Sequence, residues 1–191
     1  MKTGLFFGSF NPIHVGHMVL ANYMLAYTDM TEIWFVVSPH NPLKEKSSLL
    51  SQTHRLQMVR MAVEDHPKMK ASNIEFKLPQ PSYTINTLTH LKEKYPKKNF
   101  VLILGMDNLQ TFDKWKNYEQ ILKNHDLYVY PRLNSTCDKF KNDTRVNITQ
   151  APVIEISSSF IRSAIADKKD ISCFVPEKVG QYIKEMNFYK K

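Results

Sequence analysis

The stretch TGLFFGSFNPIHVGH, residues 3–17, decides the fold of this 191-residue chain. Its apolar run, residues 3–7, predicts a buried strand, and a helical pattern follows from residue 16. The loop between them contains Gly8, which we expect to turn the chain sharply where the strand ends. In open α/β sheets, ligands bind at the carboxyl ends of strands, so this loop is the first candidate site.

Outward from this stretch, apolar runs typical of strands alternate with helical patterns, which predicts βαβ units and a parallel sheet. The expected strands cover residues 3–7, 33–38, 73–77, 100–104, 126–130 and 152–156. The expected helices cover residues 16–28, 52–65, 84–95, 117–124, 158–166 and 176–186. We therefore predict one Rossmann-like, doubly wound α/β domain over residues 1–191.

Composition narrows the function classes. No apolar run is long enough to cross a membrane, and Met1 leads straight into a strand, so we expect a cytoplasmic protein without a signal peptide. Cys137 and Cys173 are far apart, which fits a reducing compartment. The net charge of +8 is spread without a basic stripe. It suits anionic small molecules, and we expect neither nucleic acid nor membrane as a partner.

His14 and His17 are three residues apart at the start of the first expected helix, so their rings can face the same way. Free backbone N–H groups and the helix dipole favour an anion there, which makes a phosphate site the expectation. A metal site would need further ligands, and none stands at a familiar spacing. A structural role for either histidine alone is the other alternative.

A second motif, Ile156-Ser-Ser-Ser-Phe-Ile-Arg162, follows an expected strand and opens a helix. Plain helix capping by serine is one interpretation. Three serines exceed what capping requires, and Arg162 stands one turn further along. Hydroxyl groups and a guanidinium at one helix start also suit a polyphosphate.

Together, the segment from Gly8 to His17 and the segment from Ile156 to Arg162 resemble the nucleotidyltransferase superfamily with the (H/T)-x-G-H signature. Two middle segments, Ser82–Leu88 (SYTINTL) and Gly105–Trp115 (GMDNLQTFDKW), are similar to those of bacterial nicotinate-nucleotide adenylyltransferases. The similarity covers essentially the whole chain. It implies the fold of that superfamily and the transfer of an adenylyl group from ATP to nicotinate mononucleotide, with pyrophosphate as the leaving group.

The resemblance also implies roles for individual positions. The expected catalytic residues are His14, His17 and Arg162. The expected ATP-binding residues are these three with Gly8, Ser9, Phe10, Gly105, Asp107, Ile156 and Ser158. The expected residues for nicotinate mononucleotide are Lys44, Tyr83, Thr84, Asp107 and Trp115, with Trp115 stacked on the ring. Without the resemblance, Tyr83 and Trp115 would be read as core aromatic residues and Asp107 as a helix cap.

Several expectations accompany this function. Because the attacking phosphate oxygen is already ionised, direct in-line displacement needs no general base. Mg²⁺ is expected with ATP, held by phosphates and water rather than by a protein metal site. The partners would be the two small-molecule substrates, and the protein a monomer or homo-oligomer.

Departures and alternatives remain open. The loop Pro39–Lys44 (PHNPLK) differs from the usual family loop, and Gln80-Pro81 stands where a glycine turn is expected. The long connection 131–148 is interpreted as a tolerated surface insertion. The alternative functions are a phosphopantetheine adenylyltransferase and a non-catalytic nucleotide-binding sensor.

Overall fold

The computed structural model describes residues 1–39 and 49–190 of the chain. Its described part contains one parallel sheet of six strands in the order β3-β2-β1-β4-β5-β6. The strands are β1 Lys2–Gly8, β2 Met30–Val37, β3 Met69–Ser72, β4 Asn99–Gly105, β5 Leu127–Tyr130 and β6 Val146–Ile148. This order confirms the predicted Rossmann-like sheet, whose topological switch point lies between β1 and β4.

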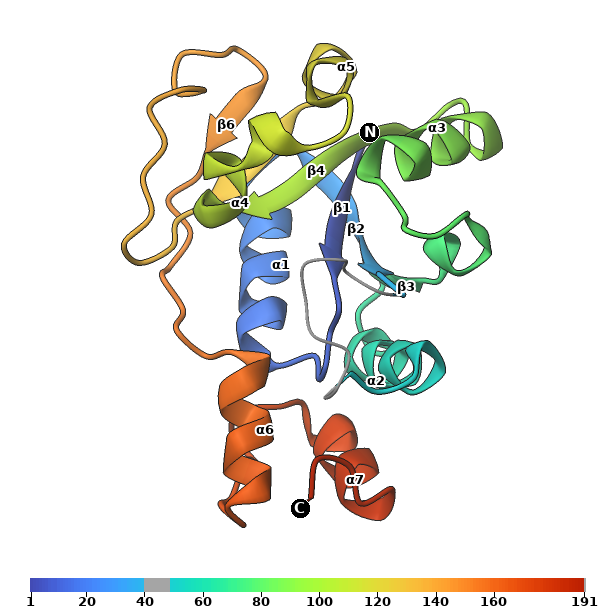
Figure 1. Cartoon of the computed structure of the whole chain (residues 1–191), viewed down its shortest axis with the longest axis vertical. Coiled ribbons are helices and arrows are strands. Elements are labelled where there is room, and N and C mark those ends of the chain that lie inside the picture. The colour runs from blue at the N-terminus through green and yellow to red at the C-terminus, as the bar shows by residue number, and fades with distance from the viewer. Residues whose placement is uncertain (40–48, 191) are drawn as a thin grey trace.

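Helices cover both faces of the sheet (Figure 1). The α-helices are α1 Val15–Tyr27, α2 Gln52–Val63, α3 Thr84–Lys94, α4 Met106–Gln110, α5 Tyr118–Asn124, α6 Ser158–Ala166 and α7 Glu177–Glu185. Two 3₁₀ turns, η2 Ile74–Lys77 and η3 Phe112–Lys114, complete the described elements. α6 and α7 lie together at one end of the molecule, below the carboxyl end of β1 in Figure 1.

Two hydrophobic clusters form because successive strand residues point to opposite faces. Phe6 and Ile103 belong to a cluster with α1, α2, α6 and α7, whereas Leu5 and Leu102 belong to a cluster with α3, α4 and α5. We call them the α1 cluster and the α3 cluster. The sheet is therefore covered on both sides, as a buried parallel sheet requires.

Two predicted strands are wrong. Residues 74–77 form the 3₁₀ turn η2, because the Glu75 side chain turns inward to accept hydrogen bonds; the strand β3 lies just before it. Residues 152–156 form no strand. The chain leaves the sheet after Thr149 donates to the Val129 carbonyl, and Ile154 and Ile156 pack against the α1 cluster instead.

The predicted helices are confirmed, with ends that shift by at most two residues. Ser51 caps α2 as expected, accepting a hydrogen bond from the His54 amide at 3.4 Å. The short helix α4 and the turn η3 were not expected. Within the described residues, no helix is long and apolar enough to cross a membrane.

Candidate active site

The loop after β1 turns at Phe10 rather than at Gly8. Phe10 has a left-handed φ of 46°, and its ring folds back into the core, where it meets the ring of His17 at a centroid distance of 5.1 Å. A Cβ atom at position 8 would lie 2.8 Å from the Phe10 ring. Gly8 is thus required for the close approach of Phe10, which corrects the expectation of a glycine turn.

The two histidines lie side by side, as their spacing predicts. Their ring centroids are 3.7 Å apart, with His14 just before α1 and His17 in its first turn. The His14 amide donates to His17 Nδ1 at 3.3 Å. Because Nδ1 accepts this bond, the neutral His17 ring carries its proton on Nε2, in the tautomer that can donate to an anion.

His14 is a buried, neutral imidazole. Burial first, and the charge of Arg132 second, lower the pKa of His14 to about 4. Its Nδ1 atom has no hydrogen-bond partner among the residues described. Gly16 leaves space for this ring, since a Cβ atom there would lie 3.0 Å from His14 Nδ1.

The start of α6 reaches the loop after β1. The Ser158 hydroxyl donates to the Pro12 carbonyl at 2.9 Å, and Arg162 Nη1 donates to the Asn11 carbonyl at 2.9 Å. Ser157 caps the helix by accepting a hydrogen bond from the amide of residue 160 at 3.1 Å. The two distant motifs therefore meet in space. Ser157 caps α6, and Ser158 ties the start of this helix to the loop after β1.

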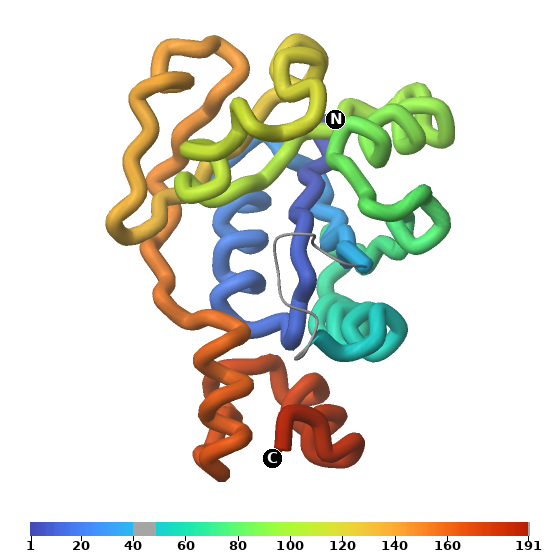
Figure 2. Tube along the Cα trace, in the orientation of Figure 1, coloured from blue at the N-terminus to red at the C-terminus, as the bar shows by residue number. Residues whose placement is uncertain are grey.

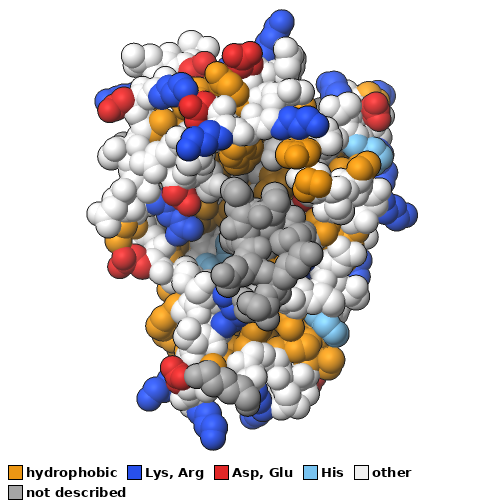
Figure 3. Space-filling view, viewed as in Figure 1, with side chains coloured by type: hydrophobic (Ala, Val, Ile, Leu, Met, Phe, Trp, Pro, Cys, Tyr) orange, Lys and Arg blue, Asp and Glu red, His pale blue; other side chains and the backbone are white. Residues whose placement is uncertain are grey.

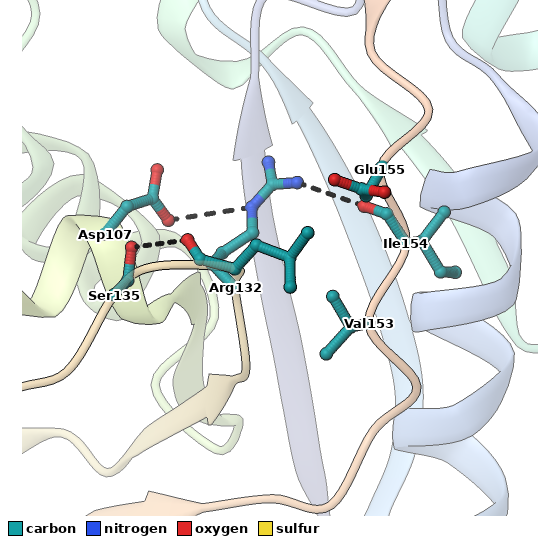
Figure 4. Close-up of a pocket in the computed structure, with 7 residues that line it drawn as sticks. Asp107, Arg132, Ser135, Val153, Ile154 and Glu155 are labelled. Atoms are coloured by element: carbon teal, nitrogen blue, oxygen red, sulfur yellow. Dashed lines mark hydrogen bonds and ion pairs between the residues drawn. The ribbon is translucent and has the colours of Figure 1, made fainter.

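A pocket of about 250 Å³ opens beside these motifs (Figure 4). Its lining includes Asp107, Arg132, Ser135, Ile154 and Glu155. Arg132 Nε lies 3.7 Å from Asp107 Oδ1, and Arg132 Nη1 donates to the Ile154 carbonyl at 3.4 Å. The pocket thus joins the end of β4 to the segment before α6.

Gly105 is required for the position of the Asp107 side chain. A Cβ atom at residue 105 would lie 2.3 Å from Asp107 Oδ1. Asp107 lies in the first turn of α4, whose N-cap is Gly105, so the alternative of an Asp107 cap is wrong.

Arg132 is absent from the predicted site residues, because residues 131–148 are interpreted from the sequence as a tolerated surface insertion. That interpretation is wrong. The segment contains β6 and the buried Phe140, and Arg132 follows β5 with only Pro131 between them. The sequence could have indicated Arg132 as a site residue by its position at the carboxyl end of a strand that neighbours β4.

Arg55 is the second missed residue. It is fully buried in α2, yet within the described ranges its guanidinium donates only to backbone carbonyls, those of Ser9, Ser38, Pro39 and Leu50, at 2.6–3.0 Å. One side chain thereby ties the ends of β1 and β2 to the chain that enters α2. Burial lowers the pKa of Arg55 to about 10, so it remains a cation at neutral pH. Only its place on the apolar face of α2 could have revealed it.

Two other segments contain the residues expected to bind nicotinate mononucleotide, which accepts the adenylyl group. We call this region the acceptor side. Tyr83 precedes α3 and is 38% exposed, and Thr84 is the first residue of α3. Trp115 follows η3 and packs against the α3 cluster, with its ring 5.4 Å from that of Phe112. These segments are neighbours, since α3 contacts α5, which follows Trp115. Lys44 lies outside the described residues.

The donor set of the site suits an anion. It offers imidazole, hydroxyl and guanidinium groups, together with the first turns of α1 and α6. Within the ranges that the structure describes, no three His, Cys, Asp or Glu side chains could together hold a metal ion. On the face shown in Figure 3, Lys and Arg side chains are scattered among acidic ones and form no stripe.

Comparisons with known proteins agree with this arrangement. The model of the cytidylyltransferase-like family matches residues 5–164. A Flavobacterium johnsoniae protein named "probable nicotinate-nucleotide adenylyltransferase" is 56% identical over 193 residues and covers 100% of both chains. A Christiangramia forsetii protein of the same name is 56% identical, covering 99% of this chain and 98% of its own.

Solved structures share the fold. Plasmodium falciparum nicotinic acid mononucleotide adenylyltransferase complexed with NaAD superposes with a TM-score of 0.80 at 20% identity, covering 98% of this chain and 97% of its own. The same protein complexed with APC gives a TM-score of 0.77 at 22% identity, with 98% and 96% covered. By its family model and its full-length relatives, the chain belongs to the cytidylyltransferase-like family and, within it, to the nicotinate-nucleotide adenylyltransferases.

Proposed function

We propose that this protein transfers the adenylyl group of ATP to nicotinate mononucleotide, forming nicotinate adenine dinucleotide and pyrophosphate. The observation that carries the proposal is the meeting of two motifs from opposite ends of the chain. Ser158 and Arg162 bond to the loop that leads into His14 and His17. Cationic and hydrogen-bonding groups thus flank one place where a triphosphate can lie.

The chemistry needs positioning more than proton transfer. A phosphate oxygen of nicotinate mononucleotide attacks the α-phosphorus of ATP, and the bond from that phosphorus to the bridging oxygen breaks as pyrophosphate leaves. His17, through Nε2–H, and Arg162 would stabilise charge on the phosphates. His14 would contact the phosphates as a neutral donor, consistent with its lowered pKa. Gly8, Ser9 and Phe10 would line the nucleotide.

Other predicted residues complete the site in this proposal. Asp107 would bind a ribose, and Gly105 permits its position. Tyr83, Thr84 and Trp115 would hold the nicotinate ring. The hydroxyl of Ser158 already donates to a carbonyl, so its contact with phosphate would require that bond to be exchanged. Ile156 packs against the α1 cluster and would act through its backbone.

Mg²⁺ enters this proposal as part of the substrate MgATP. The donor set described above fits phosphate rather than a bare cation, so the metal would be held by phosphate oxygens and water. Both cysteines are free thiols, which supports a reducing compartment such as the cytoplasm. Relatives named for the nicotinate nucleotide support that acceptor over phosphopantetheine.

Replacing His17 tests the mechanism. We expect His17→Ala to lower kcat by roughly 10²–10³, as the loss of one transition-state donor does elsewhere. His66→Ala is the matched control, because His66 is exposed beyond the end of α2. Pyrophosphate release is measured with MgATP and either nicotinate mononucleotide or pantetheine phosphate.

Three results would contradict the proposal. Wild-type protein that releases no pyrophosphate with any acceptor would favour a nucleotide sensor. Turnover of pantetheine phosphate alone would reverse the choice of acceptor. A His17→Ala variant with wild-type kcat would remove the proposed role of that imidazole.

A further inference from the structure

One lysine lies between the two segments proposed to hold the nicotinate ring. Lys116 follows Trp115 directly in the chain, and its Nζ atom lies 4.6 Å from the centroid of the Tyr83 ring. A cation over an aromatic face is held there by the ring quadrupole. The Tyr83 ring is itself 38% exposed, so this ammonium stands at an open surface rather than in the core.

Lys116 is exposed and has no acidic partner within ion-pair distance among the residues described. Asp113, three residues earlier in the chain, pairs with Lys139 instead, at 2.6 Å. The chain turns immediately after Lys116, where Asn117 has a left-handed φ of 53° and caps α5. Lys116 therefore lies outside α5, at an exposed turn.

We propose that Lys116 is a specificity-determining residue that recognises the carboxylate of the nicotinate ring. The inference rests on the proposed function and on the expected placement of that ring against Tyr83 and Trp115. Nicotinate mononucleotide carries a ring carboxylate, whereas nicotinamide mononucleotide carries a neutral amide at the same position. A nearby ammonium attracts the first and gains little from the second.

The two mononucleotides share their ribose and phosphate, so the ratio of their kcat/KM values reports recognition of the ring substituent. A lysine that merely attracts the common phosphate would change kcat/KM equally for both acceptors. A lysine that binds the ring carboxylate changes kcat/KM for nicotinate mononucleotide and leaves the nicotinamide value unchanged, so the ratio of the two values changes. Because Lys116 is exposed, one such pair is expected to change that ratio by about twofold to fivefold.

The experiment compares Lys116→Met, Lys116→Arg and Lys114→Met with the wild type. Lys114 ends η3 two residues earlier, is also exposed, and its replacement removes the same charge. For each protein, kcat/KM is measured with nicotinate mononucleotide and with nicotinamide mononucleotide at saturating MgATP. Thermal unfolding shows whether each variant folds.

We expect Lys116→Met to lower kcat/KM for nicotinate mononucleotide about twofold to fivefold and to leave the value for nicotinamide mononucleotide unchanged. Lys116→Arg keeps most of the preference, and Lys114→Met keeps the wild-type ratio. An unchanged ratio in Lys116→Met, equal losses on both acceptors, or a wild type without preference overturns the inference. Wild-type protein inactive on both acceptors overturns the proposed function instead.

Discussion

Position 14 holds an imidazole that resists protonation. His14 loses hydration on burial and also faces the positive charge of Arg132, and its pKa falls to about 4. Arg132 in turn lies near Asp107, so the guanidinium and the carboxylate of the pocket interact electrostatically. A bound polyphosphate would offset the charge of Arg132, so a neutral histidine and an arginine are compatible with the proposed anion site.

The low pKa of His14 predicts a pH dependence of stability. Because the folded pKa lies below the unfolded value of 6.5, the contribution is complete above pH 6.5 and is lost as the pH falls towards 4. We expect wild-type protein to lose about 3 kcal/mol more than His14→Asn over this interval. Denaturant unfolding from pH 4 to 8 measures the difference, and parallel curves for the two proteins would contradict it.

Among the elements, η2 positions the start of α3. Glu75 is 3% exposed, and its carboxylate accepts hydrogen bonds from the Thr87 hydroxyl at 2.8 Å and the Ser82 hydroxyl at 3.2 Å. These hydroxyls stand on either side of Tyr83 and Thr84. One buried carboxylate therefore fixes both ends of the segment proposed to hold the acceptor.

Replacing Glu75 is expected to affect the acceptor and spare ATP. Glu75→Ala leaves the two hydroxyls without their partner, so KM for nicotinate mononucleotide should rise about tenfold while KM for ATP stays within twofold. Glu75→Gln keeps an oxygen and adds an amide donor, so it should restore most of the affinity. Steady-state kinetics with each substrate varied in turn measures this, and equal rises in both KM values would refute it.

The same elements show what the sequence could reveal. The helix 158–166 was predicted at its observed bounds, because Ser157 and the apolar spacing mark its start and face. Ile74 and Phe76 alternate with polar residues, which predicts a strand where the structure has a 3₁₀ turn. The prediction fails because such periodicity indicates which side chains are buried and not whether a neighbouring strand is present. Arg55 escaped prediction because its partners are carbonyls from three separate segments, which tertiary folding alone brings together.

Across the whole molecule, the last described residues return to the loop after β1. The Tyr189 hydroxyl donates to Asn11 Oδ1 at 2.8 Å, and burial raises the pKa of that phenol. The same oxygen accepts the Leu50 amide at 3.3 Å, and the Asn11 carbonyl accepts from Arg162. The N-terminus and the last described residues nevertheless lie toward opposite ends of the long axis (Figure 2).

Removing the Tyr189 hydroxyl should therefore lower kcat, although Tyr189 is far in the sequence from the loop after β1. Tyr189→Phe deletes one hydrogen bond to Asn11 and keeps the packing of the ring, so we expect kcat to fall about threefold to tenfold. The melting temperature should fall by only a few degrees. Tyr27→Phe is the control, because Tyr27 is 74% exposed. Wild-type kcat in Tyr189→Phe would show that the contact does not position the loop.

The separation of the two hydrophobic clusters has an evolutionary consequence. Phe10 and Ile161, which support the proposed phosphate motifs, belong to the α1 cluster, whereas Ile85 and Trp115, on the proposed acceptor side, pack against the α3 cluster. The sheet stands between them as a partition. Substitutions in the α3 cluster can thus change which molecule is adenylated without moving the residues of the proposed phosphate motifs.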